Sequence, residues 1–480
     1  MPWERNASKG GRVFEREGLS REELEWNTLA QRRLRTQRFA TLKNVNPLAM
    51  PRAKALFYTC EVCTQPAKLQ CSKCGSCWCK QEHFLLDSES IHFAICPKLA
   101  EIRELSLQEG RLESLAEIVQ RAHEAPVQIG LLREVCDAAQ ERAERYIGDR
   151  CYIMAVAPAS RYMRLALLLY SATSYEYLHA SILVARAQLG LEKYSRVEAT
   201  LVQLRADAFR LLDHVQSEIG RPADTRAKPS VGGTLISLQL CTMPLRIIAR
   251  IPSRYIALLG SLYLIAGTLY LDMGRYKEAL HEYAHSSYCM ALAYGPASLE
   301  TSLAYSNVAF VYLRKAYDLP VPMRFEHFLE HIQHNPDTNI VDKETLTRAV
   351  HVALFVVNVW ATHLRQRMNM GQGITLHTRD AGDPRRVLLE IQCFIRLHCG
   401  QVSFEYGHAS LTLALLYAVY DDEANAFLHS KRAYEAFRAG LENPDAWASP
   451  YSAEAKAYAS EARETMDALS AFITRFSHLR

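Results

Sequence analysis

The chain has 480 residues, of which 49% are hydrophobic and 22% are charged, and this length allows more than one domain. Its formal net charge of +4 is small for the length. This balance argues against a dedicated nucleic-acid-binding protein, which usually carries a concentrated basic face. Residues 1–18 are polar and charged, unlike a signal peptide, and the longest apolar run, 352–361, is far shorter than the roughly 20 residues that span a membrane. We therefore expect neither nucleic acid nor a membrane as a partner.

Residues 1–45 form a basic N-terminal arm, rich in Arg, Lys and Glu and poor in large apolar groups. Ser20 and Glu23 have the spacing of a capping box, which predicts a short helix running towards Arg38. Two interpretations stay open: a disordered or docking arm, or a basic arm lying along an acidic partner surface. An extended lead-in follows at 46–51, because each proline biases its predecessor away from helix.

Between positions 60 and 96 the chain carries four consecutive pairs of cysteine or histidine residues. Eight such side chains fill two closed tetrahedral zinc sites, and a closed site is structural rather than catalytic. A segment this short cannot bury a self-sufficient core, so we expect two Zn²⁺ ions to supply its folding energy. The pairs are Cys60 and Cys63, Cys71 and Cys74, Cys79 and His83, and His92 and Cys96.

A disulfide cluster or a run of buried cysteines is the alternative interpretation of this segment. The 13 cysteines are an odd number, and those outside 60–96 show no paired spacing, which fits a reduced compartment. Reduced thiols favour metal binding over disulfides. Cys77 is a spare thiol and a possible substitute for His83 as a ligand.

From 99 to 480 the pattern predicts one helix after another, in a solenoid of tetratricopeptide-like (TPR-like) helix pairs. Small and aromatic residues recur at repeat spacing, most clearly in 255–290, where Gly274 is expected to end the first helix of a pair. Small residues allow close helix approach and aromatic rings fill the gap between helices. The repeat positions are Gly267, Tyr270, Gly274, Tyr276, Ala279 and Tyr283; Ala143, Tyr146, Ala155 and Ala159; Ala185, Tyr194, Val197 and Leu201; Ala309 and Tyr312; and Ala414, Tyr417, Ala426 and Ala433.

Several stretches interrupt this array. Glycine and proline mark an insertion at 220–253 and a linker at 369–386. Copies up to Ala309 follow a period of about 42 residues, but Ala309 and Ala414 are 105 positions apart, and helices at 343–368 and 385–399 occupy this gap out of register. A last amphipathic helix, about 451–476, is expected to cap the open end of the solenoid.

Two histidine motifs have the spacing of zinc-peptidase helices. His281 and His285 belong to an H-E-x-x-H sequence, and His327 and His331 to its inverse, H-x-x-E-H. Neither is followed by an obvious third ligand, and repeat packing already accounts for Ala279 and Tyr283. The chain contains no phosphate-binding loop and no nucleophile elbow, so we expect a protein that is not an enzyme.

The spacing of the four ligand pairs resembles the MYND-type zinc finger. This resemblance implies interleaved sites, in which the first and third pairs share one zinc and the second and fourth pairs share the other. Peptide-binding members have Gln directly after the sixth ligand and Trp a few residues on, where this chain has Phe84 and Ser88. The implied ligand sets are Cys60, Cys63, Cys79 and His83 for one zinc, and Cys71, Cys74, His92 and Cys96 for the other.

A closer resemblance covers about 46–220 and 255–480. The segment 46–52, the Cys60–Cys63 pair, the histidine at His83 and its spacing to His92 look like the axonemal MYND-finger, tetratricopeptide proteins. The resemblance implies an adaptor that docks or regulates an inner dynein arm on doublet microtubules of cilia and flagella. The partners that it implies are a second axonemal TPR protein and an inner-arm dynein heavy chain. The alternative hypothesis is a nuclear corepressor-type MYND adaptor that binds proline-containing peptides.

Overall fold

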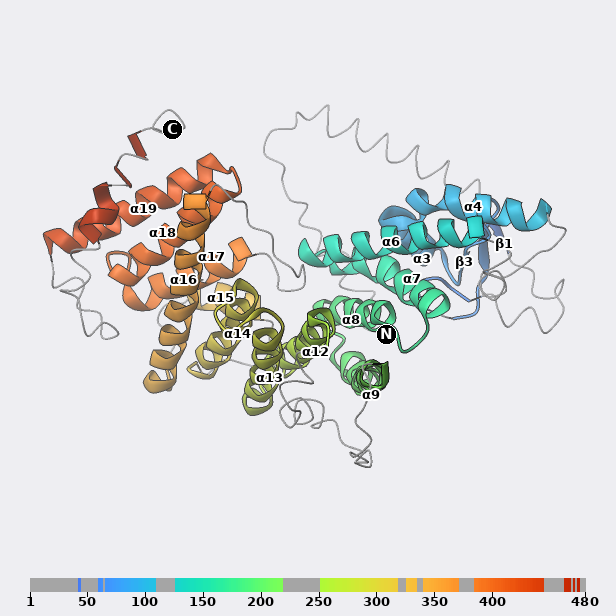
Figure 1. The fold of residues 1–480 in the computed structure, drawn as a ribbon, viewed down its shortest axis with the longest axis horizontal. Helices are drawn as coiled ribbons and strands as arrows, with labels where there is room; N and C mark the ends of the chain where they lie inside the picture. The colour runs from blue at the N-terminus through green and yellow to red at the C-terminus, as the bar shows by residue number, and fades with distance from the viewer. Residues whose placement is uncertain are drawn as a thin grey trace. The chain divides into compact units, whose positions relative to one another are not determined.

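The computed structural model describes 42–44, 59–63, 65–108, 126–218, 251–317, 325–334, 340–370, 384–443, 462–467, 469–470 and 473–474. It confirms the predicted mostly α fold: a segment with a cysteine and histidine cluster precedes a solenoid-like body of helical hairpins. Figure 1 shows the strands and helices of this fold. The chain divides into two compact units, 1–135 and 136–480. Each unit is described by itself below.

The first unit contains a three-stranded antiparallel sheet in the order β1 (Leu42–Asn44), β2 (Leu69–Cys71) and β3 (Cys77–Trp78). Leu42 pairs with Cys71, and Leu69 pairs with Trp78. The edge strand β1 therefore comes from the range predicted as the basic arm. After the sheet, the chain continues helically through α3 (Gln81–Asp87), the π-helical turn η3 (Ser88–His92) and α4 (Phe93–Gln108).

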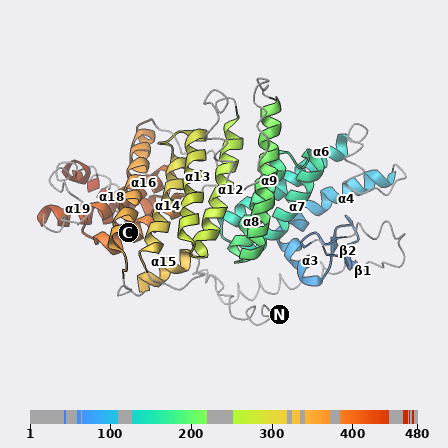
Figure 2. The same cartoon turned by 90° about the horizontal axis from the view of Figure 1, so that it is seen from below.

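The second unit is built from long helices. The boundary between the two units falls within the first of these helices, α6. From α7 on, most helices pack against the next helix along the chain, as Figure 2 shows for α12, α13 and α14. The helices are α6 (Pro126–Gly148), α7 (Tyr152–Tyr170), α8 (Tyr175–Gly190), α9 (Tyr194–Glu218), α12 (Ser253–Asp272), α13 (Tyr276–Tyr294), α14 (Leu299–Lys315), α15 (Phe325–His334), α16 (Lys343–Met370), α17 (Pro384–Cys399), α18 (Phe404–Val419) and α19 (Glu423–Glu442).

Helix α16 explains how the array continues past the break in register. It packs against α14 on one side and α18 on the other, so it takes the place of a repeat helix. Its buried face contributes Val356, Trp360 and Leu364 to the main core cluster. Helix α15 packs beside this succession, and α17 packs mainly against α18.

Four helices of the second unit end in the same turn, and the first two of these turns are 42 positions apart. One residue has positive φ, and the N–H of the next residue bonds to the carbonyl five positions earlier, as in Arg275 to Tyr270 at 2.8 Å. This is a Schellman-type C-cap, which glycine adopts at least cost. Gly274, at φ 73°, ends α12 as predicted. The positive-φ residues are Arg150, Glu192, Gly274 and Asp421.

A second repeated turn precedes α8, α14 and α18. A serine caps each helix by accepting the backbone N–H three residues on, as Ser298 accepts from Thr301 at 3.2 Å. Three residues before each serine stands a residue of positive φ, which is glycine in two turns and Ser171 in the third. The serine caps are Ser174, Ser298 and Ser403.

Glycines allow the paired helices to approach closely, as the repeat spacing predicts for Gly267. A Cβ added at Gly267 would lie 2.6 Å from the ring of Tyr283, and one at Gly407 would lie 2.6 Å from the ring of Phe437. Both distances are shorter than Cβ atoms show in nonbonded contacts. An aromatic ring therefore fills the space that each glycine leaves.

Two described helices are long and apolar enough to cross a membrane by length and composition alone. They are Ser253–Asp272 and Lys343–Gln366, with mean hydropathies of 1.4 and 1.3. Of their apolar windows, 78% and 50% are buried inside the protein. Core helices pass the same test, so these two are weak evidence for a membrane span.

Several predicted features lie outside the described residues. They are the capping-box helix of the arm, the lead-in at 46–51, nearly all of the insertion at 220–253, most of the linker at 369–386 and most of the final helix at 451–476. The two helices predicted near 343–368 and 385–399 are present as α16 and α17.

Candidate metal centre

The first quartet of ligand atoms brings together Cys60, Cys63, Cys79 and His83. Nδ1 of His83 lies 3.4 Å from Sγ of Cys60 and 3.3 Å from Sγ of Cys79, and the thiols of Cys63 and Cys79 are 3.5 Å apart. All four ligand atoms lie within 4.8 Å of one another. The first and third pairs of the sequence therefore meet at one point.

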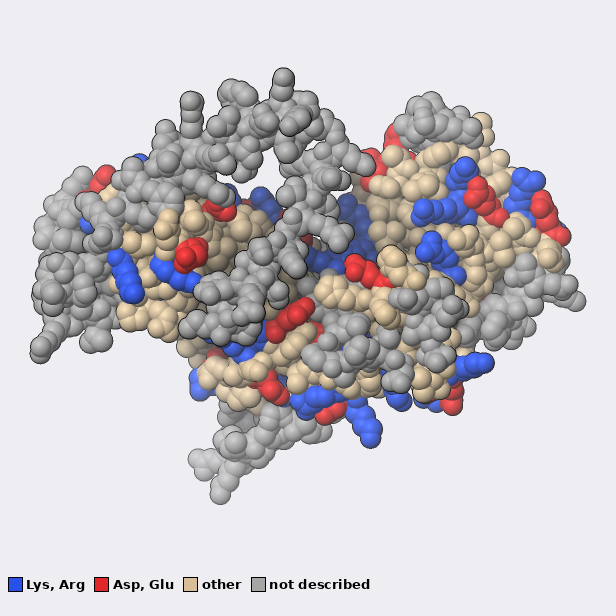
Figure 3. All heavy atoms as spheres, turned by 180° about the vertical axis from the view of Figure 1, so that it is seen from behind, with Lys and Arg blue, Asp and Glu red and all other residues tan. Residues whose placement is uncertain are grey.

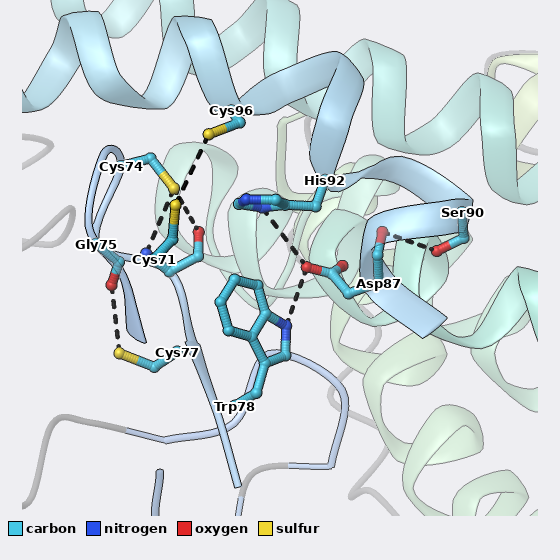
Figure 4. A network of polar contacts seen from close by, with 10 residues as sticks. Cys71, Cys74, Gly75, Cys77, Trp78, Asp87, Ser90, His92 and Cys96 are labelled. Atoms are coloured by element: carbon cyan, nitrogen blue, oxygen red, sulfur yellow. Dashed lines mark hydrogen bonds and ion pairs between the residues drawn. The ribbon is translucent and has the colours of Figure 1, made fainter. Parts of the chain in front are cut away.

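The second quartet brings together Cys71, Cys74, His92 and Cys96. The sulfur atoms of Cys71 and Cys96 are 3.9 Å apart, and the four ligand atoms again lie within 4.8 Å of one another. Figure 4 shows these sulfur atoms gathered on one side of the His92 ring. The second and fourth pairs thus meet at a second point.

Both quartets fit a tetrahedral metal ion. Sulfur and nitrogen ligands at about 2.3 Å and 2.0 Å from zinc are separated from each other by about 3.5–3.8 Å. Three of the distances between ligand atoms in the first quartet are 3.3–3.5 Å, and they need only a small expansion to reach that geometry. Three thiols and one imidazole form a donor set suited to soft or borderline ions. The two clusters could each hold one metal ion.

A tight turn after β2 positions Cys71 and Cys74. Gly75, at φ 83°, closes this turn, and its N–H donates to the carbonyl of Cys71 at 3.0 Å. From α4, the guanidinium of Arg103 donates to the carbonyls of Ser72 and Lys73 at 3.4 Å each. The turn is therefore fixed both by its own backbone and by the helix that carries Cys96.

The helical run from α3 to α4 carries the remaining ligands of the second half of the finger. His83 lies in the first turn of α3, His92 ends η3, and Cys96 follows in α4. The spacing of four residues puts His92 and Cys96 on one helix face. The π-helical turn between them and α3 has a wider repeat, a device that often occurs at functional sites.

Trp78 and Asp87 pack against His92, a member of the second quartet. The indole Nε1 of Trp78 donates to Oδ2 of Asp87 at 3.1 Å, and the same oxygen lies 3.8 Å from Nδ1 of His92 (Figure 4). The Trp78 ring packs edge-on against His92 and Phe84, with ring centroids 5.0 Å apart in each case. Because a carboxylate behind a metal-binding histidine fixes its tautomer and ring orientation, Asp87 is placed to orient His92.

The thiols of the second quartet hydrogen-bond to one another and shift one another's pKa. Hydrogen bonds from Cys74 and Cys96 lower the pKa of Cys71 well below its ordinary value, and the hydrogen bond to Cys71 raises the pKa of Cys96. In the first quartet, burial and the neighbouring Cys63 raise the pKa of Cys79 to about 12. A bound dication would replace these protons, since thiolates are the metal-binding form.

Cys77 lies apart from both quartets. Its thiol donates to the carbonyl of Gly75 at 3.2 Å, and burial raises its pKa to about 12. It is not among the ligand atoms that converge in either cluster, whereas His83 is. All the finger cysteines are free thiols, so the disulfide alternative does not describe this structure.

Two positions compared with peptide-binding MYND fingers are buried. Phe84 is 1% exposed and packs on Trp78, and Ser88 is 2% exposed. Neither side chain is available on the surface to line a peptide groove.

The histidine motifs outside the finger occupy helices α13 and α15. On α13, His281 and His285 lie one turn apart, and the carboxylate of Glu282 between them bonds to Arg205 of α9 at 2.7 Å. Glu282 is therefore committed to an interhelical ion pair. Within the described residues, the only groups of three or more potential metal ligands are the two finger quartets.

No known protein-family model matches this chain. Sequence spacing pointed to all eight side chains of the two quartets, but it did not single out Trp78 or Asp87. A tryptophan between the second and third ligand pairs was the available signal for the first of these. A single acidic residue before the fourth pair is too weak a signal to have identified Asp87.

Proposed function

We propose that this chain is a non-enzymatic adaptor of the ciliary or flagellar axoneme. In this proposal, two structural Zn²⁺ ions hold a MYND-type finger in shape, and TPR-like helix pairs bind other proteins. The observation that carries it is the combination of two closed Cys₃His quartets with a succession of packed helical hairpins. Stacked helix pairs usually present extended surfaces to partner proteins.

The assignment to zinc follows from the donor sets. Three thiolates and one imidazole in a closed tetrahedron are typical of structural zinc sites. The eight ligands leave no position for a reacting water, so the metal contributes folding energy rather than catalysis. The ion pair between Glu282 and Arg205 supports the absence of peptidase chemistry at the H-E-x-x-H sequence, because the expected general base is engaged elsewhere.

The assignment to the axoneme rests on the resemblance of the finger and its lead-in. The partners we propose are a second axonemal TPR protein and an inner-arm dynein heavy chain, on the doublet microtubule. The charge distribution supports protein partners over nucleic acid. Lys and Arg side chains lie among Asp and Glu over the described part of the face in Figure 3. Elsewhere among the described residues, basic side chains form ion pairs with acidic ones, as Arg145 does with Glu141.

The nuclear corepressor alternative finds less support. It requires the finger to read proline-containing peptides, and the two positions that would line the groove, Phe84 and Ser88, are buried. We therefore place the adaptor function in the axoneme.

Retention on axonemes tests the proposal. The tagged full-length chain is expressed in a ciliated cell, the membranes are removed with detergent, and the axonemal and soluble fractions are compared. The chain should stay with the axoneme and co-purify with an inner-arm dynein heavy chain, while a Cys71→Ala variant should be released if the finger contributes to docking. Complete recovery of the wild-type chain in the soluble or nuclear fraction would rule out the axonemal adaptor.

A further inference from the structure

A pair of histidines on α13 converges outside the finger. His281 and His285 are one helical turn apart, and their Nε2 atoms lie 3.0 Å from each other. The two rings meet edge to face, with centroids 4.3 Å apart. His281 is exposed, whereas His285 is half-buried and packs against the ring of Tyr263.

We propose that His281 and His285 bind one divalent late first-row transition-metal ion between their Nε2 atoms. Two imidazole nitrogens, each about 2.0–2.1 Å from such an ion, are about 2.9 Å apart at a right angle and about 3.4 Å apart at a tetrahedral angle. The observed 3.0 Å lies between these values. Imidazole suits Zn²⁺, Ni²⁺ and Cu²⁺, and the affinity should rise towards Cu²⁺.

The surroundings of the pair favour the neutral, metal-binding form of at least one ring. Burial, and then the neighbouring His281 and Arg205, lower the pKa of His285 below its ordinary value. The neutral imidazole then offers an unprotonated nitrogen at neutral pH. The exposed His281 gives an ion access from solvent, and binding replaces the single hydrogen bond between the rings.

This site differs in kind from the two quartets and from a peptidase centre. It has two protein ligands, so water fills the remaining coordination positions and the ion exchanges readily. Glu282 does not complete it, because that carboxylate is buried against Arg205. Binding at this site uses no residue of the finger. A test of this site therefore does not test the proposed axonemal function.

A titration of the full-length chain with Zn²⁺ tests the site. The chain is first desalted so that only tightly held ions remain, and the further binding of Zn²⁺ is measured by isothermal calorimetry. The His281→Ala variant should bind one equivalent fewer than the wild type. His351→Ala removes an exposed histidine of α16 that has no histidine one turn away, and it should bind as the wild type does.

Chemical protection locates the ion. Acylation of histidine, read by mass spectrometry of the peptides, should slow several-fold at His281 when Zn²⁺ is added and remain unchanged at His351. Circular dichroism of His281→Ala verifies that α13 and its neighbours stay folded. Equal Zn²⁺ binding by the wild type and the folded His281→Ala variant, or unchanged acylation of His281, would overturn the proposal.

Discussion

Trp78 donates its indole N–H to the carboxylate of Asp87 at 3.1 Å, and both side chains are wholly buried within the finger. Burying a carboxylate is costly unless it is paired and hydrogen-bonded. The Trp78 N–H and the nearby His92 provide that compensation, and the same carboxylate faces the ring nitrogen of His92 that points away from the sulfur atoms (Figure 4). The contact therefore links the core of the finger to its metal ligands.

Asp87→Asn should weaken metal binding at the second quartet about 10–100-fold, because an amide orients the His92 ring less firmly than a carboxylate does. Competition with a chromophoric chelator measures the affinity. Ser90→Ala is the matched control, since it removes a hydroxyl that donates to the backbone carbonyl of Asp87 and leaves the carboxylate in place. An unchanged affinity in Asp87→Asn would show that this carboxylate does not position His92.

Gly267→Ala should destabilise the protein by about 2 kcal/mol, within the usual range of 1–3 kcal/mol for overpacking a core. The added methyl would lie 2.6 Å from the ring of Tyr283 and force α12 and α13 apart. Urea unfolding measures the loss. Gly130→Ala is the control, because a Cβ at Gly130 meets nothing within 4 Å, and it should be neutral or slightly stabilising.

Ser171→Gly should stabilise the second unit by about 1 kcal/mol. Ser171 adopts φ 88° and ψ 166°, a region that is essentially restricted to glycine, and the equivalent turns before α14 and α18 have Gly295 and Gly400. Gly295→Ala should lower the stability by a similar amount, since it places a side chain in the same strained conformation. Thermal or urea unfolding of the two variants gives the comparison. Equal stabilities of Ser171→Gly and the wild type would mean that the surrounding turn carries no strain.

Stability should fall as the pH falls from about 6.5 to about 4. Burial lowers the pKa of His398, His408 and His429 from 6.5 to about 4, with lesser contributions from Arg365 at His408 and Arg432 at His429. Between these pH values the unfolded chain binds more protons than the folded chain, so protonation favours unfolding. The melting temperature of the second unit should therefore be a few degrees lower at pH 5 than at pH 7.

His429→Gln isolates one contribution to this pH dependence. The imidazole of His429 lies 3.3 Å from the amide of Gln392 and stacks on Tyr417, and glutamine can keep a hydrogen bond there without titrating. Between pH 7 and pH 5, the melting temperature of the variant should fall by less than that of the wild type. A pH dependence identical to that of the wild type would show that His429 does not titrate in this window.

The four cysteine and histidine pairs that converge in the two quartets stood out in the sequence because metal sites impose short, fixed spacings between neighbouring ligands. The close approach of Gly267 to Tyr283 was predictable for a similar reason, since repeats place small and large residues in phase. Asp87 was not, because its partner Trp78 lies nine positions away and only the π-helical turn brings the carboxylate beside His92. Local spacing carries no signal for that arrangement.

The repeated turns show a second limit of sequence patterns. Glycine marks the turn at 274, but Arg150, Glu192 and Asp421 adopt the same positive φ without it. Tertiary packing of the helix pairs overrides the local preference at these positions. The register break before α18 likewise became interpretable only from the packing of α16 between α14 and α18.

The metal content of the desalted full-length chain, compared between Cys71→Ala and Cys77→Ala, tests the central claim most directly. Elemental analysis should give two tightly held zinc ions per chain in the wild type and in Cys77→Ala. It should give one in Cys71→Ala, with the helical circular dichroism of the body retained. Two ions per chain in Cys71→Ala, or a finger that stays folded after chelation, would contradict the claim that two zinc-filled quartets hold this part of the molecule together.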